Sequence, residues 1–290
     1  HISMREKSPL LIILTNILLG AGIIHFTIPG LIFTGSELII SALIVTGLYL
    51  FCRSGVGNSF LKRCLGLQEF DFIEEFDTDA EKEDFYQADQ YVRMVFDQCL
   101  SCSKAMDNNL NNNIKLKYLK QGGFNAIAFW GNTIYLTRGL MQMPADFLSA
   151  VLMHEFGHIS DRGARWEKGL IVGELYMLFL RWFSVFVLIV TMIMSGGILK
   201  NMITLLMINL VLIAWNQIRK ASLKGYYKRC EFRADEFAVK AGLGKKLGAA
   251  LMMIENLNAG IEMPIGHFAF EDNADVKERM ENIVACIRQF

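Results

Sequence analysis

Two histidines and a glutamate lie close together in residues 154–158, which read His-Glu-Phe-Gly-His. The preceding residues, 145–153, are apolar at a helical period, so the motif is expected on a buried helix that begins near Pro144 and ends near Gly163. Side chains four positions apart on a helix point to the same side. His154 and His158 can therefore bind one metal ion. This is the pattern of a zinc hydrolase, in which the glutamate, here Glu155, takes a proton from the attacking water.

A chance occurrence of the motif is the competing interpretation. A chain of 290 residues would contain such a pattern by accident in about one case in a hundred. Burying two histidines and a carboxylate on an apolar helix is costly unless they have a partner. A metal ion supplies that partner, so the catalytic interpretation is favoured, with one zinc ion per chain as the expected cofactor.

A third protein ligand is needed, because a catalytic zinc site combines three such ligands with an open position. Asp161 is too close along the same helix for good geometry. Residues 230–238 have apolar positions at helical spacing, which places Glu231 and Asp235 on one helix face. We expect Glu231 to bind the metal and Asp235 to accept the free ring N–H of a ligand histidine. Taken alone, the same spacing is also typical of a solvated surface helix.

The chain is too apolar for an ordinary soluble domain, with 53% hydrophobic residues and a mean hydropathy of +0.32. The excess lies in four stretches with few charges, each near the length of about 20 residues that a membrane-spanning helix needs. The stretches are Leu10–Ile28, Leu31–Phe51, Leu170–Met194 and Ile198–Ile218. Pro and Gly residues interrupt each pair, which predicts two helical hairpins.

The second pair has an alternative interpretation as buried core helices or a re-entrant segment, because Glu174 and Arg181 fall inside it. If it spans a membrane, these two charges are expected to pair with each other or to face the other helices. His25 and Asn209 lie in the first and fourth stretches and are expected to make polar contacts between helices.

Lysines and arginines precede the first stretch and follow the second and fourth, whereas the hairpin tips have almost none. This asymmetry predicts that both termini and both polar segments are cytosolic. The first stretch is too long for a cleaved signal peptide, and residues 1–3 look like a remnant of cloning. A bacterial inner membrane, also called the cytoplasmic membrane, is the expected location. A formal net charge of zero gives no indication of nucleic-acid binding, and six cysteines fit a reducing compartment.

The segment between the hairpins is predicted to contain an amphipathic helix over 81–106 and then a small sheet. Residues 114–119 alternate like a strand, and a Gly-Asn pair between residues 124–130 and 133–137 indicates a β-hairpin. An exposed edge strand beside a metal helix can pair with an extended peptide through main-chain hydrogen bonds. The residues expected to bind substrate in this way are Asn125, Ala126, Ile127 and Ala128.

The order of these elements resembles the M48 family of membrane zinc peptidases, and in particular its HtpX-like branch. The resemblance rests on HEFGH at 154–158, the two apolar stretches after it, and EFRADEFA at 231–238, and it covers most of the chain. It implies a mostly α-helical integral membrane protein with a small β-sheet and a thermolysin-like (gluzincin) core. It also implies zinc binding by His154, His158 and Glu231, with Glu155 as the catalytic base.

The chain departs from the family pattern near its end, where a His-Pro pair is often followed closely by Arg-Ile. Here His267 precedes Phe268, and Arg279 precedes Met280 after a longer gap. Either His267 or Arg279 is a candidate for stabilising the oxyanion of the transition state, although a single histidine near an acidic loop is more often an ordinary surface residue.

Together these features predict a zinc endopeptidase that acts on protein substrates at the cytosolic face of a lipid bilayer. The family resemblance implies that the substrates are unfolded or membrane-associated proteins and that the role is protein quality control. The predicted organisation is a remnant at 1–3, transmembrane hairpins at 4–52 and 170–218, and cytosolic catalytic segments at 53–169 and 219–290. One alternative is a CaaX-type prenyl-protein peptidase, although such relatives have more spans. Another is a non-enzymatic membrane adaptor with structural zinc, against which the intact Glu155 argues. Neither the natural substrate nor the oligomeric state follows from the sequence.

Overall fold

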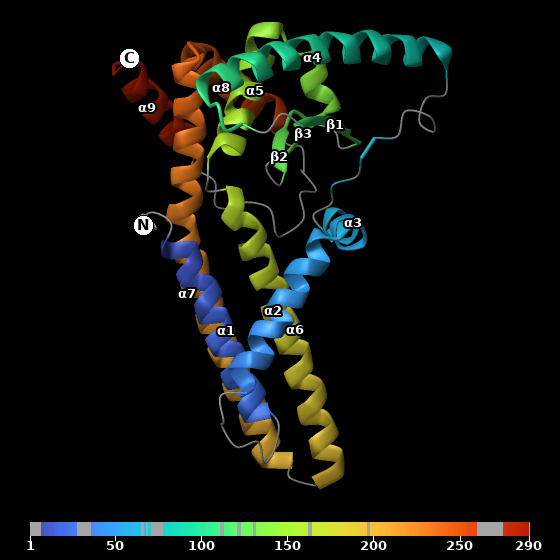
Figure 1. Cartoon of the computed structure of the whole chain (residues 1–290), viewed down its shortest axis with the longest axis vertical. Coiled ribbons are helices and arrows are strands. Elements are labelled where there is room, and N and C mark those ends of the chain that lie inside the picture. The colour runs from blue at the N-terminus through green and yellow to red at the C-terminus, as the bar shows by residue number, and fades with distance from the viewer. Residues whose placement is uncertain are drawn as a thin grey trace. The chain divides into compact units, whose positions relative to one another are not determined.

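The computed structural model divides the chain into two compact units (Figure 1). The first, here the hairpin unit, comprises residues 1–61 and 166–226, and the second, here the mixed unit, comprises residues 62–165 and 227–290. The structure describes residues 7–27, 36–64, 67, 69–70, 78–110, 113–120, 123–129, 132–161, 164–195, 198–259 and 275–289.

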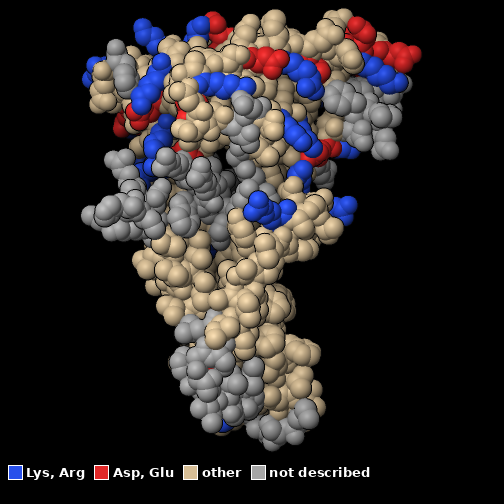
Figure 2. All heavy atoms as spheres, in the orientation of Figure 1, with Lys and Arg blue, Asp and Glu red and all other residues tan. Residues whose placement is uncertain are grey.

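The hairpin unit is made of long apolar helices, and its visible face has few charged side chains (Figure 2). Its elements are α1 (Lys7–Thr27), α2 (Ser36–Arg53), most of α3 (Gly55–Cys64), most of α6 (Ala164–Ser195) and the first part of α7 (Ile198–Lys240). In the described part of the chain, α6 and α7 are long and apolar enough to cross a membrane. A third candidate is the pair α2 and α3, which is bent by 86°. The apolar part of α1, Pro9–His25, is shorter, so the structure supports two or three of the four expected spans.

Charged and polar side chains inside this unit are paired in ways that only partly match expectation. Glu174 on α6 forms an ion pair with Arg219 on α7, so it faces another helix and does not pair with Arg181. His25 on α1 lies 3.5 Å from Glu37 on α2, which is a contact between helices as predicted. Among the described residues, the Asn209 amide donates to the Leu205 carbonyl of its own helix, so its predicted contact with another helix stays a prediction.

The mixed unit combines a small sheet with helices that pack against one another. Its elements are α4 (Asp79–Met106), β1 (Lys115–Leu119), β2 (Ala126–Phe129), β3 (Thr133–Thr137), a 3₁₀ helix η2 (Arg138–Gln142), α5 (Ala145–Ser160), the end of α7, α8 (Gly244–Asn258) and α9 (Val276–Ile287). The predicted amphipathic helix, the three strands and the motif helix are therefore all present. α5 follows Pro144 as expected, whereas Gly163 lies outside the described residues.

The sheet has the strand order β1-β3-β2, so β1 and β2 are its two edges. β2 and β3 pair antiparallel, which confirms the predicted hairpin, and β1 pairs parallel to β3. Asn125 exchanges hydrogen bonds with Thr137, the last residue of β3. Because backbone groups alternate in direction along a strand, the N–H and C=O groups of Ala126 and Ala128 point away from β3, toward the free edge.

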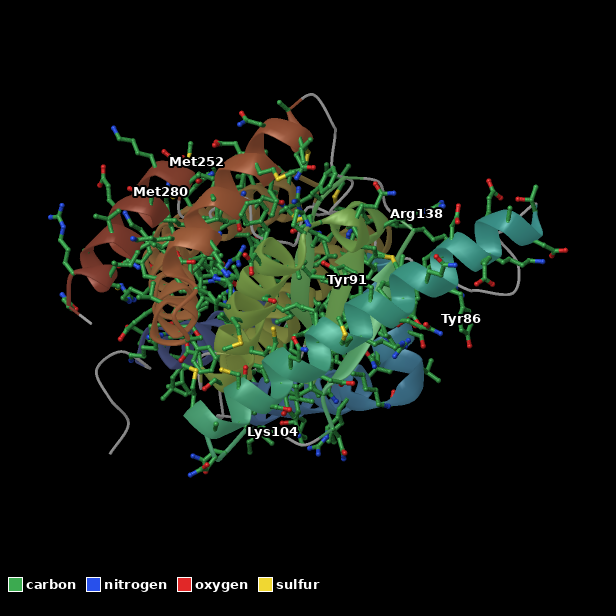
Figure 3. All side chains as sticks on the ribbon, turned by 90° about the horizontal axis from the view of Figure 1, so that it is seen from above. Tyr86, Tyr91, Lys104, Arg138, Met252 and Met280 are labelled. Atoms are coloured by element: carbon green, nitrogen blue, oxygen red, sulfur yellow. The ribbon has the colours of Figure 1, made fainter. Side chains whose placement is uncertain are left out.

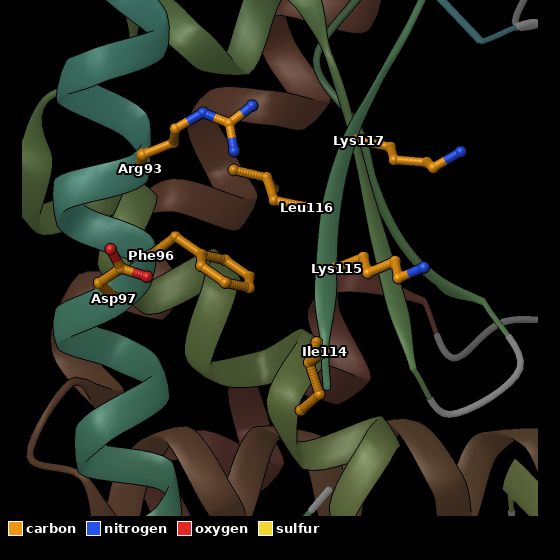
Figure 4. Close-up of a pocket in the computed structure, with 7 residues that line it drawn as sticks. All are labelled: Arg93, Phe96, Asp97, Ile114, Lys115, Leu116 and Lys117. Carbon is orange, nitrogen blue, oxygen red and sulfur yellow. The ribbon is translucent and has the colours of Figure 1, made fainter. Parts of the chain in front are cut away.

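One face of β1 packs against α4. Ile114 and Leu116 point toward Phe96, and a groove of about 350 Å³ lies between the two elements (Figure 4). Lys115 and Lys117 point to the opposite face of the sheet. This is the alternation predicted for the strand. The groove contains none of the residues of the His-Glu-Phe-Gly-His motif.

On the opposite face of the sheet, the Glu69 carboxylate forms hydrogen bonds that connect strands β1 and β3 to the end of α3. Glu69 accepts hydrogen bonds from Lys62 at 2.6 Å, from Lys117 at 2.5 Å and from the Tyr135 hydroxyl at 2.7 Å. Burial favours the neutral carboxyl, but these three donors outweigh it and lower the pKa of Glu69 to about 2. The charged form of Glu69 therefore stabilises the folded state.

Replacing Glu69 with glutamine is expected to lower the thermal midpoint of the mixed unit by about 2–4 °C at neutral pH, which corresponds to about 1 kcal/mol for a partly exposed network. Because the folded pKa lies below the usual carboxyl value of 4.5, this stability is present above about pH 4.5 and is lost as the pH falls toward 2. Thermal unfolding of the detergent-purified protein between pH 7 and pH 3 measures it. Glu255→Gln, at an exposed position of α8, is the control; equal curves for Glu69→Gln and wild type would contradict the prediction.

α9 is held in place by close packing on α8, where Met280 lies beside Met252 (Figure 3). A Cβ atom built at Gly248 of α8 would lie 3.0 Å from both the sulfur and the terminal carbon of Met280. The absence of a side chain at this glycine therefore leaves room for the end of the Met280 side chain on α8.

Candidate active site

The site is built by two helices of the mixed unit that cross at a glycine. α5 carries the His-Glu-Phe-Gly-His motif and the end of α7 carries Glu231 and Asp235. A Cβ atom built at Gly157 would lie 2.8 Å from the Cα of Ala234, 3.0 Å from its carbonyl oxygen and 2.9 Å from the Cβ of Phe237. Only glycine at this position lets the two backbones come so close, and this approach brings Glu231 beside the histidines.

Donor atoms from three side chains lie close together. The Nε2 atoms of His154 and His158 are 3.1 Å apart. The Glu231 carboxylate oxygens lie 3.4 Å from the first of these nitrogens and 3.3 Å from the second. Glu231 and His154 are buried. Although burial favours its neutral form, the two histidines hold the pKa of Glu231 well below its usual range, so this ligand set includes one negative charge.

The spacing of these atoms fits a zinc ion. Zinc bonds to nitrogen and carboxylate oxygen are about 2.0–2.2 Å long, so two ligands of one tetrahedral zinc lie about 3.3–3.6 Å apart. The distances between the donor atoms of His154, His158 and Glu231 are 3.1–3.4 Å. Two imidazole nitrogens with one carboxylate, leaving a fourth position open, are also the ligand types of a catalytic zinc centre.

Glu155 is directed elsewhere. Its carboxylate also lies within reach of the two histidines, but it accepts a hydrogen bond from the backbone N–H of Ala128 at 2.6 Å. Glu231 instead has one carboxylate oxygen 3.4 Å from His154 Nε2 and the other 3.3 Å from His158 Nε2. The two carboxylates thus differ in their contacts: Glu231 lies against both histidine Nε2 atoms, and Glu155 is bonded to the outward N–H of Ala128 on β2.

Asp235 and Arg279 surround the far side of His154. Asp235 is fully buried, and its carboxylate lies 2.9 Å from Nδ1 of His154, which directs the Nε2 lone pair toward the other ligands. The Arg279 guanidinium donates to Asp235 at 2.6 and 3.1 Å and lies 3.3 Å from Glu231. Burial and Arg279 oppose protonation of His154, but its hydrogen bonds to Asp235 and Glu231 outweigh them and raise its pKa.

A second link ties the end of α5 to α7. Asp161, which was rejected as a metal ligand because of its position on the helix, forms an ion pair with Arg233 at 2.6 Å. Arg233 lies between Glu231 and Asp235 in the sequence. This pair therefore supports the crossing of the two helices next to Gly157.

Comparison with known protein families agrees with this arrangement. The model of the family "Peptidase family M48" matches residues 87–281, which include every residue of the site. The chain belongs to peptidase family M48. It is therefore a member of a family of zinc-dependent metallopeptidases, and the metal-ligand geometry described above agrees with this assignment.

The chain was also compared with curated protein sequences and with solved structures. No curated protein sequence matches the chain. Among solved structures, the crystal structure of S. mikatae Ste24p is similar over 85% of this chain, with 18% sequence identity and a TM-score of 0.39. The alignment spans 66% of the length of the Ste24p chain.

The structure brings most of the predicted site residues of this M48 member together. The cluster is formed by His154, Glu155, His158, Glu231, Asp235 and Arg279, and Ala128 contacts it through Glu155. Asn125 and Ile127 have their backbone groups directed at β3, so only Ala126 and Ala128 of the predicted peptide-binding strand present them to the edge. His267 lies outside the described residues. Gly157 was not singled out from the sequence, although a glycine inside a helix indicates close packing.

Proposed function

We propose that this M48 member is a zinc endopeptidase of the HtpX-like branch with a gluzincin core. The observation that carries the proposal is the convergence of His154, His158 and Glu231 beside a separate carboxylate, Glu155, at the free edge of a β-strand. A structural zinc site has no need of such a carboxylate or of such an edge. We assign one zinc ion per chain to the three ligands.

In this proposal, different residues bind the substrate and transfer the proton during hydrolysis. An extended substrate pairs with the outward groups of Ala126 and Ala128, which is recognition largely independent of sequence. Ala128 N–H then bonds to the substrate and releases Glu155. A zinc ion held by His154, His158 and Glu231 would polarise the scissile carbonyl and lower the pKa of the attacking water. The released Glu155 takes the proton of that water and delivers it to the leaving amine.

Asp235 and Arg279 position the ligands. Asp235 fixes the tautomer and orientation of His154, and Arg279 compensates the buried negative charge of Asp235 and Glu231. Arg279 has its donors directed at these carboxylates, so we assign it a positioning role and leave His267 as the candidate for stabilising the oxyanion.

The wider setting is also part of the proposal. We place four spans, in two hairpins, in a bacterial inner membrane with the site and both termini cytosolic, following the distribution of lysine and arginine. Unfolded or membrane-associated proteins are the proposed substrates, and quality control is the proposed role. The predicted boundaries at 4–52, 53–169, 170–218 and 219–290 remain proposals.

Hydrolysis of casein by the detergent-purified protein, with and without zinc, tests this function. Cleavage that a chelator abolishes and zinc restores is expected. A farnesylated CaaX peptide tests the first alternative, because selective cleavage of that peptide would indicate a prenyl-protein peptidase. A folded protein that holds one zinc ion and cleaves neither substrate would favour the adaptor with structural zinc.

Replacing Glu231 with glutamine is expected to weaken zinc binding by more than about 100-fold, because loss of even an outer hydrogen-bond partner costs about 10–100-fold. Zinc retained per chain during titration with a competing chelator measures this. Glu236→Gln is a matched control on the same helix, where Glu236 pairs with Lys240 at 2.7 Å. If Glu231→Gln retains zinc as well as this control does, Glu231 is not a ligand.

A further inference from the structure

The junction of α2 and α3 is a sharp bend built by local hydrogen bonds. α2 ends at Arg53, and α3 begins at Gly55 and runs at 86° to it (Figure 1). The Ser54 hydroxyl donates to the Phe51 carbonyl at 2.7 Å and accepts from the Gly57 N–H at 3.1 Å. A Cβ atom at Gly57 would lie 1.9 Å from the Phe51 carbonyl oxygen, so only glycine fits. The Ser54 hydrogen bonds and the glycine at position 57 thus stabilise this turn.

α3 has one apolar side that faces outward. Val56 is 75% exposed and Phe60 is 48% exposed, and the two lie one helical turn apart. Leu61, on another side of the helix, is buried. With ten residues, α3 is half the length of about 20 residues that a spanning helix needs. It also contains Lys62 and Arg63, which are costly in hydrocarbon.

The surroundings of α3 have the composition of a membrane interface. Tyr49 at the end of α2 is partly exposed, and tyrosine is enriched at membrane–water interfaces. Phe51 and Phe60 are partly exposed beside it. Arg53 and Arg63 are exposed, and neither has a carboxylate partner among the described residues. Residues 38–68 contain no aspartate or glutamate. This region therefore has a uniformly positive charge next to exposed apolar side chains.

We propose that α3 is an interfacial helix that binds the surface of an anionic lipid bilayer. Val56 and Phe60 enter the boundary between headgroups and acyl chains, and Arg53 and Arg63 bind the phosphates of anionic lipids such as phosphatidylglycerol. The right angle at Ser54 turns the chain from the direction of a span into the plane of the membrane. This inference rests on the proposed membrane location of α2.

Depth-dependent quenching tests the proposal on the full-length protein in vesicles of phosphatidylcholine with a minority of phosphatidylglycerol. A genetically encoded fluorescent amino acid replaces Val56 in one variant and Leu43, a 65% exposed residue of α2, in another. Lipids brominated near the headgroup or in the middle of the acyl chain are the quenchers. We expect the label at 56 to be quenched best by shallow bromines and the label at 43 by deep bromines.

Lipid charge is tested with the label at 56 and the bromine placed on either lipid. At equal mole fraction, brominated phosphatidylglycerol is expected to quench at least about twofold more than brominated phosphatidylcholine. The difference is expected to disappear in Arg53→Gln/Arg63→Gln and to persist in Lys245→Gln/Lys277→Gln, a control that removes two positive charges at exposed positions of α8 and α9.

The outcomes separate this inference from the proposed function. Deep quenching at both positions would show that α2 and α3 form one broken span and would overturn the interfacial helix. Equal quenching by the two lipids, or no quenching at 56 while 43 is quenched, would overturn it too. No quenching at 43 would instead overturn the membrane location of α2.

Discussion

Replacing Glu155 with glutamine is expected to lower kcat for casein hydrolysis by about 10²–10⁴-fold, the usual contribution of a general base, while one zinc ion per chain is retained. The amide oxygen of glutamine can still accept the Ala128 N–H bond that Glu155 makes at 2.6 Å, but the amide cannot take a proton from water. KM is therefore expected to change little. Steady-state kinetics together with metal analysis of both proteins measures these quantities.

One control variant and the metal content of Glu155→Gln make this result specific to the base. Glu255→Gln removes an exposed carboxylate of α8 and is expected to leave kcat unchanged. Loss of zinc from Glu155→Gln would instead make Glu155 a ligand, since it lies within reach of both histidines. Full activity of the variant would place the base elsewhere.

Replacing Gly157 with alanine is expected to remove zinc binding and activity together. The added Cβ would meet the backbone of Ala234 at 2.8 and 3.0 Å and the Cβ of Phe237 at 2.9 Å. None of these atoms is the end of a flexible side chain, so α5 and α7 must separate, and Glu231 moves away from His158. Overpacking of this kind costs about 1–3 kcal/mol in the free energy of unfolding.

Metal content, casein hydrolysis and thermal unfolding of Gly157→Ala are the measurements. The matched control is Gly47→Ala on α2, where a Cβ atom has open space and alanine favours the helix by about 0.5–1 kcal/mol over glycine. That variant is expected to keep zinc and activity. If Gly157→Ala retained zinc and wild-type activity, the close crossing of α5 and α7 would not be what places Glu231.

Glu155→Gln and Gly157→Ala are expected to differ in whether metal binding is lost together with activity. Glu155→Gln is expected to separate chemistry from metal binding, because Glu155 contacts the edge strand and lies outside the ligand set. Gly157→Ala is expected to lose both, because metal binding depends on the distance between two helices. The contrast thus distinguishes a residue that acts on the substrate from one that holds the scaffold.

Features that depend on local spacing could be predicted from the sequence alone. The i, i+4 spacing of His154 and His158 requires only a helix, and so does the shared face of Glu231 and Asp235. The amphipathic α4 and the β2–β3 hairpin follow from period and turn residues that act within a few positions. Family membership also followed, because these local motifs occur in a fixed order along the chain.

The contacts between segments far apart in the chain could not be predicted in this way and became known from the three-dimensional structure. Nothing in the local sequence shows that Gly157 lies against Ala234, that Ala128 N–H bonds to Glu155, or that Arg279 joins Asp235 to Glu231. The parallel pairing of β1 with β3 and the pairing of Glu174 with Arg219 are of the same kind. Each depends on packing between elements far apart in the chain, where volume, burial and the pairing of buried charges select the partner, whereas sequence patterns report only which face of each element is apolar.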